Sequence, residues 1–71
     1  MLATLSVADS SWIEHVAYDA EHHELTVVTK KGDTMIYTGV PAPVWSDLQA
    51  APSKGGFISH KVIRVYPRKA E

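Results

Sequence analysis

The sequence predicts a small α+β domain, in which a three-stranded antiparallel β-meander is followed by a carboxyl-terminal pair of helices. Three observations lead to this prediction. Apolar and β-branched residues alternate with polar ones between residues 12 and 38, which is typical of half-buried strands. Two short polar turns interrupt the alternation, and apolar residues recur at helical spacing beyond residue 43. With 71 residues, the chain has room for one such domain.

The second turn sets the register of the last two strands. The run Thr-Lys-Lys-Gly-Asp suits a three-residue hairpin loop that ends with Gly32 in the left-handed region. This loop places Val27 opposite Met35. It also places Leu25 opposite Tyr37. A two-residue loop would divide the apolar residues between the two faces of the sheet, so the three-residue loop is preferred.

The first turn, around residues 21–22, extends the same apolar face into the first strand. It sets Tyr18 opposite Leu25, and Val16 then falls opposite Val27. The meander therefore has one apolar face, and that face needs a covering layer.

A first helix is predicted to supply this cover. Val40 and Pro41 end the third strand, and proline is tolerated in the first turn of the helix that follows. Val44, Leu48 and Ala51 recur at intervals of four and three residues, which gives the helix one apolar stripe.

A second helix is predicted after Ser53, which can cap residues 54–60. Residues 61–66 are ambiguous, because their β-branched residues favour a strand whereas the spacing of their apolar residues fits a helix. The helix is the main prediction, and a fourth strand in a βββαβ arrangement is the alternative. Pro67 ends the element in either case.

The predicted domain spans residues 10–67, between an amino-terminal tail of residues 1–9 and a basic carboxyl-terminal tail of residues 68–71. The amino-terminal residues lack the basic start and apolar stretch of a signal peptide, and no apolar run approaches the roughly 20 residues that cross a bilayer. The chain has no cysteine, which excludes a disulfide scaffold, a cysteine-based zinc site and thiol catalysis. We expect a cytoplasmic protein with no membrane partner.

The net charge of -1 conceals an uneven distribution along the chain. Residues 1–29 hold five acidic and no basic residues, whereas residues 54–71 hold five basic residues and one acidic residue. Such asymmetry is compatible with a nucleic-acid surface, and equally with two halves that offset each other in the fold. The candidate nucleic-acid ligands in the basic segment are Lys54, His60, Lys61, Arg64, Arg68 and Lys69.

Other constellations give weaker signals. Four histidines could be considered as metal ligands: His15, His22, His23 and His60. Two of them are adjacent, which makes a poor chelate, and no third ligand stands at zinc-site spacing, so we expect no metal. Nothing resembles a nucleophile elbow or a serine–histidine–acid site. Lys54-Gly55-Gly56 lacks the spacing of a phosphate-binding loop, and its glycines suit a sharp turn between helices.

An ordered set of motifs covers residues 10–67. It begins with Ser10-Ser11-x-Ile13 and includes Gly32-x-x-Met35-x-Tyr37-x-x-Val40-Pro41, followed by Leu48-x-x-Ala51-x-Ser53-x-Gly55 and Arg64-x-Tyr66-Pro67. The residues expected to form the core and the motif are Tyr18, Leu25, Val27, Met35, Tyr37, Val40, Pro41, Leu48, Phe57 and Tyr66. The set resembles the KTSC domain, a family named for its presence at the carboxyl end of some lysyl-tRNA synthetases and also found as small free-standing bacterial and phage proteins.

The chain departs from this family pattern at a few positions. Met35 stands where the family usually has a tyrosine, and Ser59 stands where an asparagine is common. At the position of Val62 a β-branched aliphatic residue fits the pattern, often isoleucine. The resemblance implies no catalytic residue and no cofactor, and it carries a suggestion of RNA binding through the association with the synthetase.

Two functions follow as expectations. The first is a non-catalytic module that binds RNA or single-stranded nucleic acid through the basic segment. The alternative is a protein-interaction or self-assembling module, in which sheet edges, or Trp12 and Trp45, form the contact. So small a core is marginally stable, and self-association would add to it.

Overall fold

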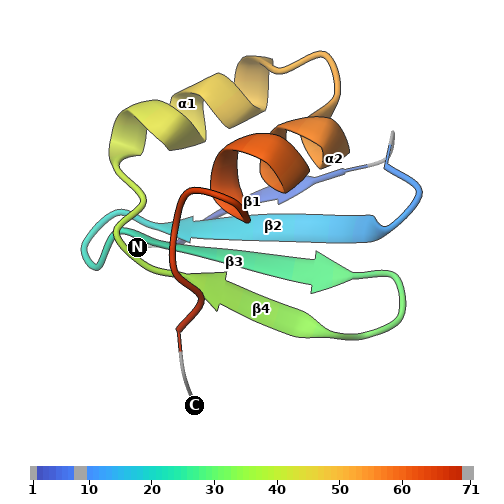
Figure 1. The fold of residues 1–71 in the computed structure, drawn as a ribbon, viewed down its shortest axis with the longest axis horizontal. Coiled ribbons are helices and arrows are strands. Elements are labelled where there is room, and N and C mark those ends of the chain that lie inside the picture. The colour runs from blue at the N-terminus through green and yellow to red at the C-terminus, as the bar shows by residue number, and fades with distance from the viewer. Residues whose placement is uncertain (1, 8–9, 70–71) are drawn as a thin grey trace.

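The computed structural model describes residues 2–7 and 10–69 and has two layers, a four-stranded antiparallel sheet and a helical layer on one of its faces (Figure 1). The strands follow one another in the order β1-β2-β3-β4. They are β1 (Leu2–Ser6), β2 (Ile13–Asp19), β3 (Glu24–Thr29) and β4 (Thr34–Tyr37). The helices are α1 (Ala42–Ala50) and α2 (Lys54–Phe57), and α2 continues into a π-helical segment, Ile58–Val62. The predicted α+β class is confirmed.

The register predicted for the meander is confirmed. Leu25 lies opposite both Tyr18 and Tyr37, and Val27 lies opposite Val16 and Met35. The loop between β3 and β4 has the predicted form, because Gly32 has a φ of +93°. The Thr29 N–H also closes the loop by donating to the Asp33 carbonyl at 2.9 Å. The turn between β2 and β3 holds His23 at a φ of +53°, a left-handed conformation in which histidine is enriched.

The sheet has four strands, so the predicted number of three is wrong by one. The additional strand lies within residues 1–9, which were predicted to be a tail. Leu5 of β1 lies opposite Val16 of β2 and packs against the core, and Val7 just beyond β1 is buried. The alternative with four strands has the right number, but its fourth strand was placed at residues 61–66. Residues 1 and 8–9 lie outside the described residues.

The helical layer covers the predicted apolar face. Trp45 and Leu48 of α1 are buried, and the Trp45 ring stacks on Tyr18 with the ring centroids 5.5 Å apart. The hydroxyl of Tyr18 donates to the carbonyl of Val40 at 2.7 Å, which ties β2 to the chain entering α1. Burial raises the pKa of this tyrosine, and the nearby charge of Asp19 adds to the effect. Because Trp45 belongs to the core, it cannot form the surface contact considered from the sequence.

The second helix begins at its predicted cap. The Ser53 side chain accepts a hydrogen bond from the Gly56 N–H at 3.3 Å. The π-helical segment buries Ile58 and Val62. Residues 63–65 are turns, so the helix predicted through residue 66 ends at Val62 and residues 61–66 are not a strand.

The chain then returns to the free side of β4 (Figure 1). The Thr38 N–H donates to the Pro67 carbonyl at 3.0 Å, and the Lys69 N–H donates to the Ile36 carbonyl at 2.6 Å. Arg68 and Lys69 of the predicted basic tail therefore lie alongside β4, while residues 70–71 lie outside the described residues.

Most of the residues predicted for the core are buried or half-buried. Its buried members are Tyr18, Leu25, Val27, Tyr37, Val40 and Leu48. Met35, Phe57 and Tyr66 are half-buried and pack against that core, and the Tyr37 hydroxyl donates to the Met35 sulfur at 3.6 Å. Pro41 is exposed and occupies the N-cap position of α1. No helix in the described part of the chain is long and apolar enough to cross a membrane.

Candidate nucleic-acid interface

Three of the six predicted nucleic-acid ligands lie in the π-helical segment after α2 or in the turn that follows it. His60, Lys61 and Arg64 are all exposed, and the residues between them that face the sheet are buried or packed. We call these three the helical basic group. Their exposure leaves their charges or ring nitrogens available to an anionic ligand.

The other three predicted ligands make contacts of their own. The Lys54 ammonium turns back and donates to the carbonyl of Ala51 at 3.3 Å. The Lys69 ammonium lies 3.4 Å from the carboxylate of Glu24. Arg68 is exposed beside β4 and pairs with Tyr37 through a backbone bridge. The basic segment of the sequence is therefore not one continuous patch in the fold.

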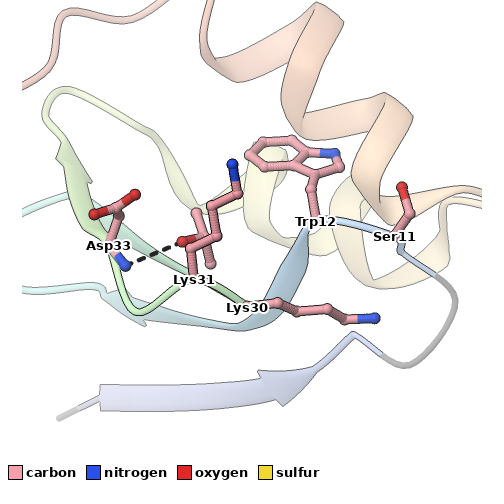
Figure 2. A pocket seen from close by; sticks show the side chains of 6 residues that line it. Ser11, Trp12, Lys30, Lys31 and Asp33 are labelled. Carbon is pink, nitrogen blue, oxygen red and sulfur yellow. Dashed lines mark hydrogen bonds between the residues drawn. The ribbon is translucent and has the colours of Figure 1, made fainter.

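A pocket at the start of β2 adds a feature that was not predicted. It has a volume of about 220 Å³. Its lining residues are Ser11, Trp12, Thr29, Lys30, Lys31 and Asp33, and we call it the Trp12 pocket. Figure 2 shows the Trp12 indole above the β3–β4 loop, with the Lys31 side chain rising toward it and that of Lys30 extending away. The lining thus combines an aromatic ring with two lysines, of which Lys31 is directed toward the ring.

The backbone explains why these residues meet. The buried Ser10 hydroxyl accepts hydrogen bonds from the N–H groups of Trp12 and Ile13, at 3.2 and 3.1 Å, which fixes the turn before β2. The Lys30 N–H donates to the Trp12 carbonyl at 3.0 Å, which joins the hairpin loop to that turn. On the other side of the loop, the Asp33 N–H donates to the Thr29 hydroxyl at 3.0 Å (Figure 2).

The start of α2 packs against the same tryptophan. A Cβ placed on Gly55 would lie 3.3 Å from the Trp12 indole nitrogen and 2.8 Å from the Ser10 hydroxyl oxygen. Only a glycine allows this approach without a shift of its neighbours. The contact puts the Trp12 pocket at the end of the molecule where α2 begins, so the helical basic group follows on the same helical run.

Three acidic residues gather at the other end of the sheet. β2 runs from Ile13 to Asp19, so its ends lie roughly 20 Å apart. Asp19 and Glu21 lie at the far end, in or next to the β2–β3 turn, and Glu24 follows at the start of β3. The chain therefore separates its acidic hairpin turn from the Trp12 pocket by the length of a strand.

Hydrogen bonding shifts two pKa values in this acidic turn. The His22 ring nitrogen Nδ1 lies 2.8 Å from an Asp19 carboxylate oxygen. The pKa of Asp19 is lowered, chiefly by that bond, and the pKa of His22 is raised, again chiefly by the bond and then by the Asp19 charge. The potential ligand atoms of Asp19, Glu21 and His22 lie within 4.8 Å of one another. The imidazole and the carboxylate bond to each other in this turn, and exposed acidic groups of this kind are common without a metal.

The other histidines lie elsewhere. His15 on β2 has its Nδ1 atom 3.4 Å from the carboxylate of Glu14, the residue before it. His60 belongs to the helical basic group. The predicted absence of a histidine metal site stays a prediction.

Sequence reasoning considered Trp12 only as a protein contact and left Lys30 and Lys31 as loop residues. The strand pairing explains why the Trp12 pocket was not predicted. The register between β2 and β3 shifts between Ile13 and His15, so Ile13 lies opposite Thr29. Without the shift, the register of the meander would have placed Ile13 opposite Lys30, one residue further along the chain. The sequence shows the tryptophan and the Lys-Lys loop, but not that they lie side by side. Their proximity depends on this register shift.

Comparisons with known proteins agree with one another. Over its whole length, the chain superposes on 99% of the crystal structure of a KTSC domain protein from Yersinia pestis, with a TM-score of 0.86 and 24% sequence identity. At that identity the likeness shows the fold. No curated protein sequence matches the chain. The KTSC domain family matches residues 9–66, and because this match spans most of the sequence, the chain belongs to the KTSC domain family.

Proposed function

We propose that this domain is a non-catalytic, cytoplasmic module that binds single-stranded RNA, with the Trp12 pocket as the site of one base. One observation carries the proposal. The half-buried indole of Trp12 and the side chains of Lys30 and Lys31 line the same hollow. Proteins that bind single strands combine aromatic platforms with cations that hold the backbone.

The indole supplies the affinity that does not depend on sequence. Every base has a π-face, and stacking one base on an aromatic side chain contributes about 1–3 kcal/mol. The two lysines supply charge next to the stacked base, where the phosphates of the strand lie. Asp33 lies in the same lining and offsets one of these charges.

The helical basic group extends the interface. Gly55 contacts Trp12, and Lys61 lies six residues further along the helical run, roughly 9 Å at the helical rise. Arg64 follows after the π-helical segment and is exposed. A strand with one base on Trp12 therefore has cations for its neighbouring phosphates within a short distance.

The charge balance predicts modest affinity. The net charge is -1, and the acidic β2–β3 turn repels a nucleic acid that approaches that end. For a single strand the logarithm of the binding constant falls with the logarithm of the salt concentration, with a slope of about -0.7 per neutralised phosphate. Binding measured at low salt should therefore weaken steeply as salt is added.

The test is a titration of the protein with a fluorescently labelled oligouridine, followed by anisotropy and by tryptophan emission. Trp45 is buried in the core, so quenching by the RNA reports Trp12. Trp12→Leu should weaken binding by about 5- to 150-fold, which is the stacking energy expressed as a ratio. Circular dichroism verifies that the variant is folded.

A matched pair of double variants tests the position of the cations. Lys30→Gln with Lys31→Gln removes two charges from the pocket and should reduce the salt slope by about 1.4. Arg68→Gln with Lys69→Gln changes the net charge equally at the β4 edge and should leave the slope nearly unchanged. Lys61→Glu with Arg64→Glu should abolish binding. Absence of binding at low salt, or equal effects of the two glutamine pairs, would refute the proposal.

A protein-interaction role remains the alternative, and its salt response separates it from the RNA role. Contacts between proteins lack the steep, linear dependence on log salt that phosphate neutralisation imposes. With Trp45 buried, the surface features left for this alternative are Trp12 and the sheet edges.

A further inference from the structure

The two edge strands of the sheet differ in whether another segment of the chain bonds to their outer side. At β4, the chain's own residues 67–69 occupy the free side of the strand with two backbone hydrogen bonds. At β1, the opposite edge, the described residues pair with β2 alone. One edge is therefore closed by the protein itself, and the other leaves a row of backbone donors and acceptors available.

The direction of these backbone groups follows from one backbone hydrogen bond between Val7 and β2. The Val7 N–H donates to the Glu14 carbonyl at 3.1 Å, so Val7 points its backbone groups toward β2. Because successive residues of a strand alternate, Leu5 also points inward, whereas Thr4 and Ser6 direct their N–H and C=O groups to the open side. The same alternation at β4 directs Ile36 and Thr38 outward, and these are the two residues that residues 67–69 satisfy.

The composition of β1 does not protect this edge. Natural edge strands are commonly blocked by lysine, proline, a bulge or a covering segment. The strand Leu-Ala-Thr-Leu-Ser has no charged residue and no proline. Ala3, Thr4 and Ser6 are exposed, so no other described segment covers the strand.

We propose that β1 pairs with β1 of a second copy of this chain, in an antiparallel arrangement with the two-fold axis at Thr4. In this register Thr4 faces Thr4 of the other copy, and both direct their backbone groups at each other. Ala3 then faces Leu5 across the interface, on the side of the sheet that the helices cover. The two sheets join into one of eight strands, with both helical layers on the same side.

The strand is complementary to itself in this register. Opposed backbone groups meet at residues 2, 4 and 6, and apolar side chains meet on the covered face, where Ala3 is exposed and Leu5 only half-buried in the single chain. No charge opposes the approach, because β1 carries none. A threonine pair on the open face is a favourable cross-strand pair. A second copy satisfies all of these conditions at once.

Cysteine cross-linking tests the register. The chain has no cysteine, so Thr4→Cys introduces a single one. Directly opposed residues of a hydrogen-bonded antiparallel pair have Cα atoms about 5.5 Å apart, within the range of a disulfide. Under mild oxidation Thr4→Cys should give a covalent dimer. Ser6→Cys is the matched control on the same strand, because its two copies would lie four residues apart and should cross-link far more slowly.

Sedimentation velocity tests the association itself. The wild-type chain should approach twice its 7.8 kDa mass as its concentration rises. Thr4→Lys places two like charges opposite each other and should give a monomer at every concentration. Thr34→Lys makes the same change at an exposed threonine of β4 and should leave the dimer intact.

Circular dichroism of each variant separates loss of the dimer from loss of the fold. A folded Thr4→Lys monomer beside a dimeric wild type and Thr34→Lys supports the proposal. A wild type that stays monomeric at the highest attainable concentration overturns it, as does equal cross-linking of Thr4→Cys and Ser6→Cys. The RNA-binding proposal does not depend on either result, because the Trp12 pocket uses no residue of β1.

Discussion

A single glycine determines how closely the second helix approaches the Trp12 pocket. A Cβ on Gly55 would lie 2.8 Å from the Ser10 hydroxyl oxygen, whereas a Cβ on Gly56 would lie 3.1 Å from that of Ser53. The Ser10 hydroxyl holds two backbone N–H groups and cannot move away freely. We predict that Gly55→Ala is less stable than Gly56→Ala by about 1–3 kcal/mol, the usual cost of overpacking. Urea denaturation of both variants measures the difference.

Comparing these two alanines removes a common effect, because both gain about 1 kcal/mol of helix propensity. A double-mutant cycle then identifies the contact. Gly55→Ala should cost less in a Ser10→Ala background, where the overlapping oxygen is absent. Equal costs in both backgrounds would show that the serine is not what limits the approach.

The Asp19–His22 pair makes stability depend on pH. The pKa of His22 is raised above 6.5, so its contribution is complete below pH 6.5 and is lost as the pH rises through the raised value. The pKa of Asp19 is lowered below 3.8, so its contribution is complete above pH 3.8 and is lost as the pH falls through the lowered value. We predict that Asp19→Asn lowers stability most near pH 5.

Thermal unfolding of the two proteins across the pH range measures this effect. Asparagine keeps the acceptor oxygen for the Glu21 and His22 N–H groups, so the variant isolates the charge. An NMR titration should also show a lower pKa of His22 in Asp19→Asn. A stability difference that is constant between pH 5 and pH 9 would contradict the prediction.

At the level of elements, the meander could be predicted because its signals are local. Gly32 marks a loop that requires a positive φ, and this loop sets the pairing of Val27 with Met35. β1 carries no such signal. It is five residues long, it lies at an edge, and six residues separate it from β2 in the sequence. Its assignment as strand rests on pairing with β2, which is a tertiary interaction.

The part of the candidate site that depends on local sequence signals could also be predicted. Exposure of the helical basic group follows from helical periodicity around Ile58 and Val62. The Trp12 pocket instead depends on the register shift in β2 and on a backbone bond from Lys30. The position of Lys69 against Glu24 requires knowing that the last residues return to β4, and nothing local in the sequence indicates that return.

The strap formed by residues 67–69 should contribute measurably to stability. The Lys69 N–H donates to the Ile36 carbonyl at 2.6 Å, and a backbone hydrogen bond contributes about 1 kcal/mol. Lys69→Pro removes this donor and should lower the free energy of unfolding by about that amount. Arg68→Pro is the control, because its N–H faces away from β4, and Lys69→Gln controls for the lost charge. Similar urea midpoints for the two proline variants would contradict this role.

At the scale of the molecule, charge and edge structure divide the surface into separate regions. The acidic β2–β3 turn lies at the end of the sheet remote from the Trp12 pocket, and β1 offers an uncharged edge between them. The offset of charges expected from the sequence is seen between Lys69 and Glu24. The cations of the proposed RNA interface are all exposed, namely Lys30, Lys31, Lys61 and Arg64.

A dimer through β1 would also change the thermodynamics of the whole chain. Unfolding of an associated protein depends on concentration, because mass action favours the dimer. A tenfold increase in concentration adds about 0.7 kcal/mol per chain, which for a domain of this size raises the melting temperature by about 3–6 °C. Calorimetry should show this rise for wild type and Thr34→Lys and show a constant melting temperature for Thr4→Lys. A constant wild-type value over that range would mean that the small core is stable without a second copy.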